Sequence, residues 1–387
     1  MLKETSSANL VETRPLFYVV DWLPPDFGAV GQYAVLFATE IAANGRRVEL
    51  IGLTSGAESI TEERFQSGGS LRITRITIPS YDKSNNLHRL LWTLRTNLRL
   101  ISEVIVNPRS VRAEVLFTGS PPFMLPFSFI AKMLRRAKLT YRITDFFPEV
   151  ISANSSKPSL FLSILQRVIW ILRRQVDSFQ VLGEDQRRLL LAGGISPQRI
   201  IMKRDVSPVV ISGDEKPAKR PDELGSGLVI LYSGNYGVAH DSETVIEGLI
   251  KYHSRIRKHP FSLWLNASGA RVDHVEKRLR AHGIRVARTS PASLSELPAI
   301  LAAADVHLIT LRPEFVGIVL PSKVYSCISS RRPVLFVGPK SSDVHSLCLD
   351  SGVLYEQVDS GDAVGFADSL DRLAALLTNS PMRDPQV

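Results

Sequence analysis

Short apolar runs alternate with longer segments of helical pattern along this chain. Residues 17–22 (FYVVDW) and 48–53 (VELIGL) have the length and the apolar character of buried strands. Between them, Tyr33, Leu36 and Ile41 recur at the spacing of one face of a helix. We therefore predict a βαβ unit, in which a helix connects two parallel strands.

The same scheme recurs in both halves of the chain. Residues 206–225, between the halves, are rich in Pro, Gly, Ser and charge, which is typical of a linker. We predict an α/β protein with a Rossmann-like domain at 1–205, a second one at 226–370, and a C-terminal tail at 371–387. The further strand-like runs are 115–117, 139–143, 179–182, 227–232, 261–265, 306–311 and 334–337.

The charge of the chain is uneven. All of the net charge of +9 lies in residues 1–205, which hold 27 Lys and Arg against 18 Asp and Glu. Such a basic half attracts anionic surfaces, for example lipid head groups or phosphate-bearing substrates. The sequence contains no nucleic-acid-binding motif, and we therefore expect no nucleic acid as a partner.

Cysteine content and the start of the chain indicate the compartment. Two cysteines, Cys327 and Cys348, exclude a disulfide framework and a thiolate zinc cage. The first fourteen residues have no apolar run typical of a signal peptide, and no stretch reaches the ~20 apolar residues of a membrane-spanning helix. We expect a cytoplasmic protein, attached peripherally to the inner face of the plasma membrane.

Small loops that contain glycine follow the predicted strands of the C-terminal half. They are SGNYG (233–237), NASGAR (266–271) and GIVLPSK (317–323). Ligands of open parallel sheets bind at the carboxyl ends of the strands, where backbone N–H groups and helix N-termini favour a diphosphate. An ordinary tight turn explains the first of these loops equally well.

Glu314 and Lys323 carry more information than the loops. Glu314 follows an apolar run that should be buried, and its carboxylate is therefore placed to bind sugar hydroxyls. Lys323 follows Pro321-Ser322 near the predicted start of a helix, where a cation opposes the helix dipole. A bound diphosphate would resolve that conflict. The alternative is a solvated surface lysine.

Four ordered segments resemble the GT-B retaining glycosyltransferases of family 4. The similarity is to enzymes of bacterial exopolysaccharide and O-antigen synthesis, of the colanic-acid and N-acetylfucosamine transferase kind. It implies a GT-B fold, with two Rossmann-like domains facing each other across a cleft. It also implies a retaining enzyme that moves a sugar from a nucleotide-sugar donor to a polyprenyl-diphosphate-linked saccharide acceptor. The segments are 23–53, 177–200, 230–249 and 313–339.

The resemblance assigns roles to single residues. Glu314 matches the first acidic residue of the family's Glu-x7-Glu element, which contacts the donor sugar. The second acidic residue, which normally holds the ribose, lies seven positions before the Pro of the following strand; counted back from Pro333, that position is Ser326. The loop around Val238 lacks the usual cations for the diphosphate. Lys323 is our first choice for the missing charge, ahead of Arg271 and Lys340.

The N-terminal domain is expected to hold the acceptor. Asp145 lies at a strand end and is a candidate acceptor-orienting group or base, although an N-cap or an ion pair with Arg142 explains it equally well. The catalytic set is therefore Glu314, Lys323 and Asp145. The expected donor-binding set is Gly28, Gly31, Ser233, Gly234, Asn235, His240, Ser268, Gly269, Arg271, Gly317, Pro321, Ser322 and Ser326.

No Asp-x-Asp triplet occurs and the histidines show no metal spacing, and we expect no cofactor and no obligatory metal. Backbone N–H dipoles and Lys323 would stabilise the departing diphosphate while Glu314 orients the sugar. The nucleotide-sugar is a substrate in this scheme. Two other functions stay open: a nucleotide-sugar 2-epimerase of the same fold, and a non-catalytic glycosyltransferase-like scaffold.

Two segments of the N-terminal half suggest an anionic membrane surface as a partner. Residues 122–138 and 160–174 couple apolar runs to basic clusters, as helices that lie in a membrane interface do. Core helices of a Rossmann-like domain explain both segments equally well. The basic excess of this half favours the membrane and a lipid-linked acceptor.

Overall fold

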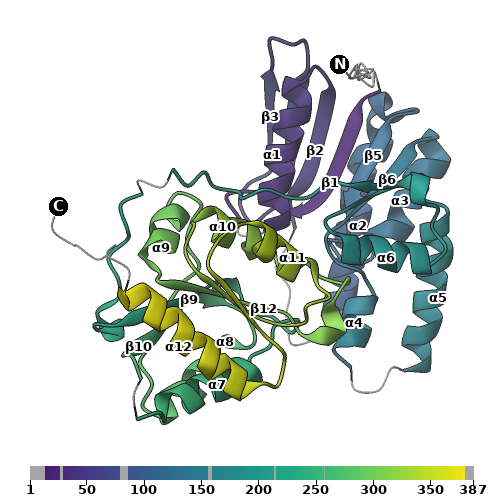
Figure 1. Ribbon diagram of the computed structural model, residues 1–387. Coiled ribbons are helices and arrows are strands. Elements are labelled where there is room, and N and C mark those ends of the chain that lie inside the picture. Colours follow the sequence, from purple (N-terminus) through teal and green to yellow (C-terminus); the bar gives the residue numbers. More distant parts are fainter. Residues whose placement is uncertain are drawn as a thin grey trace, which may run out of the picture. The chain divides into compact units, whose positions relative to one another are not determined.

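The computed structural model describes residues 14–26, 29–78, 86–155, 159–212, 215–256 and 258–379 (Figure 1). Contacts between residues divide the chain into two compact units, each built on one β-sheet. Unit 1 comprises Met1–Glu149, Pro158–Leu182 and Leu190–Lys203, and unit 2 comprises Val150–Lys157, Gly183–Leu189 and Arg204–Val387.

Unit 1 contains an eight-stranded sheet, counted over the described residues, in the order β3-β4-β2-β1-β5-β6-β7-β8. Neighbouring strands are parallel except for β3 and β4, which pair antiparallel. The strands are β1 (Leu16–Trp22), β2 (Arg47–Thr54), β3 (Ser59–Arg64), β4 (Ser70–Thr77), β5 (Glu114–Thr118), β6 (Lys138–Ile143), β7 (Ser178–Val181) and β8 (Ile200–Met202). The helices of this half of the chain are α1 (Ala29–Ala43), α2 (Asn86–Val106), α3 (Met124–Arg135), α4 (Glu149–Ala153), α5 (Leu160–Arg174) and α6 (Glu184–Ala192).

Unit 2 contains a six-stranded parallel sheet, again counted over the described residues, in the order β11-β10-β9-β12-β13-β14. Its strands are β9 (Leu228–Asn235), β10 (Phe261–Ser268), β11 (Val286–Thr289), β12 (Val306–Thr310), β13 (Val334–Val337) and β14 (Tyr355–Val358). Its helices are α7 (Glu243–His253), α8 (Val272–Ala281), α9 (Leu297–Ala303), α10 (Lys323–Ser329), α11 (Asp343–Asp350) and α12 (Ala363–Asn379), with a short 3-10 turn, η4, at Pro313–Phe315.

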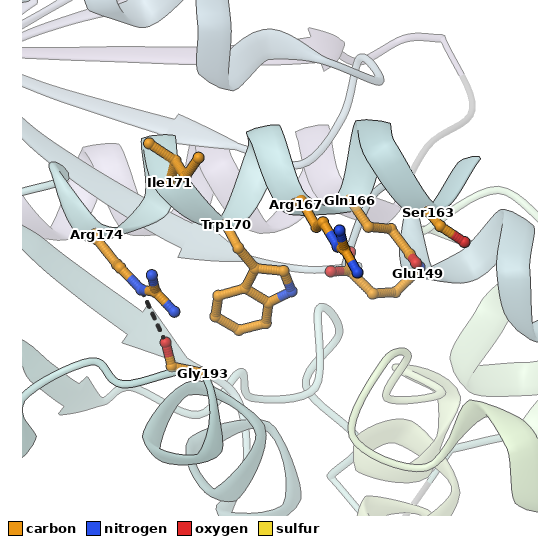
Figure 2. A pocket seen from close by; sticks show the side chains of 8 residues that line it. All are labelled: Glu149, Ser163, Gln166, Arg167, Trp170, Ile171, Arg174 and Gly193. Carbon is orange, nitrogen blue, oxygen red and sulfur yellow. Dashed lines mark hydrogen bonds between the residues drawn. The ribbon is translucent and has the colours of Figure 1, made fainter. Parts of the chain in front are cut away.

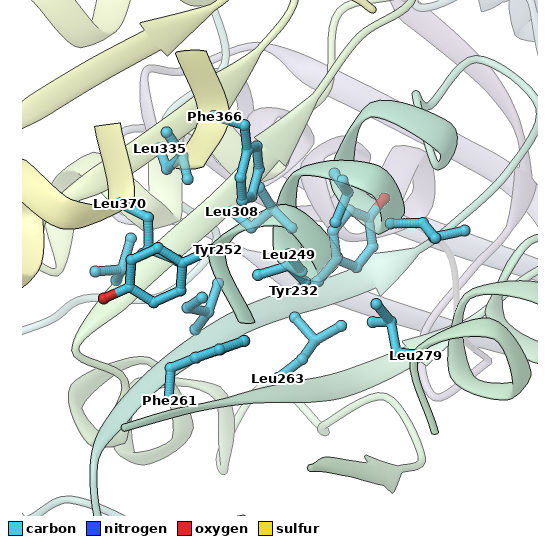
Figure 3. Packing of buried hydrophobic residues seen from close by; sticks show 14 of the residues in the cluster. Tyr232, Leu249, Tyr252, Phe261, Leu263, Leu279, Leu308, Leu335, Phe366 and Leu370 are labelled. Atoms are coloured by element: carbon cyan, nitrogen blue, oxygen red, sulfur yellow. The ribbon is translucent and has the colours of Figure 1, made fainter. Parts of the chain in front are cut away.

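The core of unit 2 joins one face of its sheet to helices α7, α8 and α12 (Figure 3). Phe366 of α12 packs directly on Gly248 of α7, where a Cβ atom would lie 2.4 Å from the phenyl ring. Glycine at this position therefore lets the two helices approach closely. Because the sheet is parallel, the carboxyl ends of β9, β10 and β12 meet at one edge, with Asn235 paired to Ser268.

The structure corrects two expectations about element boundaries. Residues 371–379 belong to α12, so the tail expected from residue 371 is helical as far as Asn379. Ser233 and Gly234 belong to β9, which we expected to end at residue 232. The next helix, α7, begins at Glu243 after an irregular loop.

Gly31 allows α1 to pack against the end of β1. A Cβ atom at this position would lie 1.8 Å from the carbonyl oxygen of Trp22. We predict that Gly31→Ala destabilises unit 1 by about 1–3 kcal/mol, because the helix must shift away from the strand. The matched control is Gly56→Ala, where the nearest atom is Thr54 Oγ1 at 3.6 Å. Urea unfolding followed by tryptophan fluorescence measures both; equal midpoints for the two variants would refute the packing role.

Candidate active site

Lys323 places a buried ammonium group at the sheet edge of unit 2. It is the first residue of α10, and its Nζ lies 3.1 Å from the centroid of the Tyr232 ring. Within the described part of the chain, this Nζ is buried and has no hydrogen-bond partner. Burial lowers the pKa of Lys323 well below its usual range. The expectation of a solvated surface lysine is therefore wrong.

The loops after β9 and β10 form one connected edge beside Lys323. A Cβ atom built on Gly234, whose φ is +107°, would lie 4.0 Å from Lys323 Cε. The Tyr236 N–H donates to Ser268 O (2.6 Å), and the Arg271 N–H donates to Tyr236 O (3.1 Å).

Asn235 and Gly269 complete this edge. Gly269 has a φ of +115°, and a Cβ atom there would lie 2.4 Å from Asn235 Oδ1. The glycine thus leaves room for the Asn235 amide. Ser233 Oγ donates to Asn266 Oδ1 (3.3 Å), which ties the two strands together. The edge therefore brings Ser233, Gly234, Asn235, Ser268, Gly269 and Arg271 together, as the sequence predicts.

At the N-terminus of α7, where we expected free N–H groups to be available to a diphosphate, one N–H group is already bonded to a side chain. The Asp241 side chain accepts from Thr244 N (2.9 Å) and from Thr244 Oγ1 (2.8 Å). A carboxylate thus already caps the helix. The end of α7 therefore has fewer free N–H groups for an anion than an uncapped helix.

His240 lies under the same loop in its neutral form. Its Nδ1 donates to Thr310 O (2.7 Å), because a carbonyl can only accept, and its ring meets the rings of Tyr232 and Tyr236 edge to face. Burial, together with the nearby Lys323 charge, lowers the pKa of His240 to about 3. With the proton on Nδ1, Nε2 carries the lone pair and can accept a hydrogen bond.

Glu314 lies in η4 with its side chain about half exposed (53%). Its Oε2 is 3.4 Å from Arg312 Nε. Arg312 also donates to Val238 O (3.2 Å) and its guanidinium lies over the Phe315 ring. Arg312 therefore connects Glu314 to the loop in which the resemblance leaves a cation missing.

Ser326 occupies an internal position in α10. It is 5% exposed, and its Oγ lies 3.4 Å from Ser207 Oγ. Of the neighbouring predicted residues, Gly317 has a φ of +76°, Pro321 is buried, and Ser322 precedes the first residue of α10. The carboxylate expected for a ribose is thus replaced by a hydroxyl that contacts another serine.

Unit 1 has a pair of buried carboxyl groups at the carboxyl ends of its strands. Asp145 follows β6, and burial, reinforced by the charge of Asp21, raises its pKa to about 6. Asp21 lies in β1 and accepts from Ser120 Oγ (2.5 Å) through Oδ2. Its Oδ1 is buried without a partner among the residues that are described, and burial raises its pKa. Gly28 lies outside the described residues.

Two curated proteins are similar in sequence to this chain. No family model matches the chain. A Pseudomonas aeruginosa protein named as the glycosyltransferase WbjE is 25% identical over 285 residues, 70% of this chain and 69% of that protein. The Escherichia coli K12 protein WcaI, named as a colanic acid biosynthesis glycosyl transferase, is 29% identical over 180 residues. That alignment spans 45% of this chain and 43% of WcaI.

Solved structures share the fold over nearly the whole chain. A glycosyltransferase from Rickettsia africae superposes with a TM-score of 0.59 at 15% identity, over 95% of this chain and 89% of that one. Anabaena HepE, crystallised with UDP and glucose, superposes with a TM-score of 0.60 at 12% identity, over 93% and 89%. The chain is a glycosyltransferase with the GT-B fold.

Three residues that lie next to the predicted site residues of this glycosyltransferase are not predicted from the sequence. Tyr232 reads only as a strand residue, yet its ring supports Lys323. Arg312 directly precedes Pro313-Glu314, so the cation is visible in the sequence, but its link to the distant Val238 loop is not. Asp21 lies inside an apolar run, and its acidic character is the available signal. Over the described residues, no group of three or more His, Cys, Asp or Glu side chains is arranged to hold a metal ion.

We predict that Asp145→Asn stabilises the enzyme at neutral pH but not in acid. The folded pKa of about 6 exceeds the ordinary value of 3.8, so the folded state binds more protons between these values. Stability of the wild type should therefore fall as pH rises through this window, and the variant should gain roughly 1–3 kcal/mol above it. Urea unfolding at about pH 4 and about pH 8 measures the difference. Asp222→Asn, at a side chain 86% exposed, is the control; the same pH dependence in both variants would contradict the prediction.

Proposed function

We propose that this enzyme transfers a sugar from a nucleotide-diphosphate sugar to a lipid-linked saccharide, with retention of configuration. One observation carries the donor class. The Lys323 ammonium is buried at a strand-end edge without a counter-ion among the described residues, and an aromatic face supports it. A cation–π contact contributes roughly 0.5–2 kcal/mol, less than a carboxylate or phosphate partner offers a desolvated ammonium. A diphosphate supplies the charge that this position lacks.

Each group at the edge has a task in that reaction. Lys323 and the backbone N–H groups of the Gly234 loop stabilise negative charge as the sugar–phosphate bond breaks. Neutral His240 presents Nε2 as an acceptor and adds no second positive charge beside Lys323. Glu314 accepts hydrogen bonds from hydroxyls of the transferred sugar, and Arg312 holds its carboxylate in place.

The nucleoside is held less by side-chain charge than the family pattern suggests. Ser326 provides one hydroxyl, already within reach of Ser207, where a carboxylate would accept from both ribose hydroxyls. Ser233, Ser268, Pro321 and Ser322 complete the proposed lining, with Arg271 as a second cation. We therefore expect the diphosphate to dominate donor affinity. The similarity to HepE, which was crystallised with UDP and glucose, supports a nucleotide-sugar as the donor.

The acceptor belongs to the carboxyl edge of unit 1. Asp145 and Asp21 are both buried with raised pKa values, so a protonated carboxyl can donate to an acceptor hydroxyl and an ionised one can accept from it. Retention and the polyprenyl carrier follow from the resemblance to polysaccharide enzymes. The name of WcaI supports a place in cell-surface polysaccharide synthesis. Both cysteines are free and buried, which suits a cytoplasmic enzyme.

A donor screen tests this proposal. UDP-, GDP- and dTDP-sugars are each expected to raise the melting temperature of the wild type if they bind, and we predict that at least one does. Lys323→Met should abolish that shift while leaving the melting temperature of the free protein equal or higher, because a buried charge is removed. Lys251→Met, at an exposed lysine in the last turn of α7, is the control and should retain the shift. A Lys323→Met enzyme that keeps the full shift would overturn the diphosphate role.

Measurements of turnover distinguish sugar transfer from the two other functions, the 2-epimerase and the non-catalytic scaffold. Glu314→Gln should lower kcat about 10²-fold or more with little loss of the donor's thermal shift, because its carboxylate acts on the sugar. The control is Glu356→Gln in β14, which removes a carboxylate paired with Arg372 of α12 and should leave kcat unchanged. Release of nucleotide from the donor without any acceptor would favour a 2-epimerase. Polysaccharide assembly that is unaffected by Glu314→Gln would favour a non-catalytic scaffold.

A further inference from the structure

Three neighbouring helices of unit 1 carry apolar side chains on their outer faces. Helix α2 contacts α3, and α3 contacts α5 (Figure 1). Each helix exposes large apolar residues at spacings of three, four or seven, so that they lie along one stripe. We call this set the three-helix face: Leu90, Leu91, Leu94, Leu98, Ile130, Met133, Leu134, Leu160, Phe161, Ile164, Val168 and Ile171.

The exposure on this face is large. Leu160 is 79% exposed, Met133 76% and Phe161 74%. Single exposed apolar residues are ordinary on soluble proteins, but a contiguous patch over three helices marks an interaction surface. Water contact costs about 25 cal/mol per Å² of apolar surface, and a partner that covers the face recovers that cost.

The orientation of α5 is fixed from inside. Arg173 is fully buried and forms an ion pair with both carboxylate oxygens of Glu149, and it also donates to Phe147 O (2.7 Å). Leu162 and Ile169 point into the core on the same side. The helix is therefore apolar on its inner face and on its outer face. The alternative from the sequence, that residues 160–174 form a core helix, explains only the inner face of α5.

The charges on these three helices are mostly positive. Helices α2, α3 and α5 contain a single carboxylate, Glu103, and eight Lys or Arg residues. Exposed Arg95, Arg136 and Arg167 form no ion pair with any carboxylate that the structure describes. A second copy of the chain would bring two basic surfaces together, which is unfavourable. An anionic partner is complementary.

A groove of about 600 Å³ lies on the flank of α5 (Figure 2). Trp170 forms its floor and packs on Gly193, where a Cβ atom would lie 2.0 Å from the indole ring. Arg167 and Arg174 stand at its rim, and Arg174 Nε donates to Gly193 O (3.3 Å). Tryptophan beside arginine is the side-chain combination typical of the membrane–water interface.

We propose that the three-helix face docks on an anionic phospholipid surface. The apolar side chains enter the acyl boundary, and Arg95, Arg136 and Arg167 contact lipid phosphates. None of the described helices is long and apolar enough to cross a membrane, so the helices lie in the plane of the interface. The proposal does not depend on the donor site, and it would bring the enzyme to a lipid-linked acceptor.

Vesicle flotation of the full chain tests the proposal. The wild type should float with vesicles of equal parts phosphatidylglycerol and phosphatidylcholine, and not with phosphatidylcholine alone. The double variant Phe161→Ser/Ile164→Ser should lose about tenfold in partition coefficient at any salt concentration, because apolar insertion is removed. Arg95→Gln/Arg167→Gln should weaken binding and reduce its salt dependence. Leu349→Ser, at an exposed leucine of α11 in unit 2, is the control and should float as the wild type does.

The result that would overturn the proposal is wild-type protein that stays unbound with anionic vesicles. A concentration-dependent dimer, dissociated by Phe161→Ser/Ile164→Ser in light scattering, would also overturn it, because a second copy would then cover the face. A donor-induced thermal shift measured on the same variants should equal that of the wild type. Loss of flotation with an intact shift therefore concerns only the docking surface, and loss of the shift concerns only the donor site.

Discussion

The ammonium group of Lys323 is the constraint around which the donor edge is organised. It lies against the face of Tyr232 instead of beside a carboxylate, so the folded protein carries an incompletely compensated charge. Tyr232 in turn stacks on Tyr236 at 3.9 Å, and both rings meet the edge of His240. The aromatic stack excludes water and favours neutral His240, which leaves Lys323 as the positive charge buried there. A diphosphate is the ligand that this arrangement stabilises most.

The surrounding backbone serves the same ligand. Gly234 and Gly269 have positive φ values, and the absence of a Cβ atom at Gly269 leaves room for the Asn235 side chain at the strand ends. Arg312 links Glu314 to the Val238 carbonyl. The carboxylate that we propose for the sugar and the loop that we propose for the diphosphate are thus connected through one side chain, although they are far apart in sequence. Asp241 caps α7, which leaves fewer free N–H groups for an anion at the end of this helix.

The sequence predicts the strand–helix alternation and the grouping of the strand-end loops well, because buried parallel strands read as short apolar runs. It does not predict β3, whose residues are exposed and polar, or β11 and β14, which are short edge strands. Glu314 and Lys323 can be found from local context. Their partners Tyr232 and Arg312 cannot, because the contacts Tyr232–Lys323 and Arg312–Val238 join residues more than seventy positions apart and no local pattern encodes them. The sequence predicts only part of the three-helix face. Residues 122–138 and 160–174 show apolar runs with basic clusters, but only the structure shows that the leucines of α2 face solvent.

The central claim is that the donor's diphosphate becomes the counter-ion of Lys323. Binding of UDP should then raise the depressed pKa of Lys323, so that the complex takes up a proton at pH values between the lowered and the raised pKa. Calorimetric titration with UDP in buffers of different ionisation enthalpy measures this uptake directly. The account predicts an uptake approaching one proton per UDP in the wild type and none in Lys323→Met. Binding of UDP without proton uptake, or with the same uptake in both proteins, would contradict it.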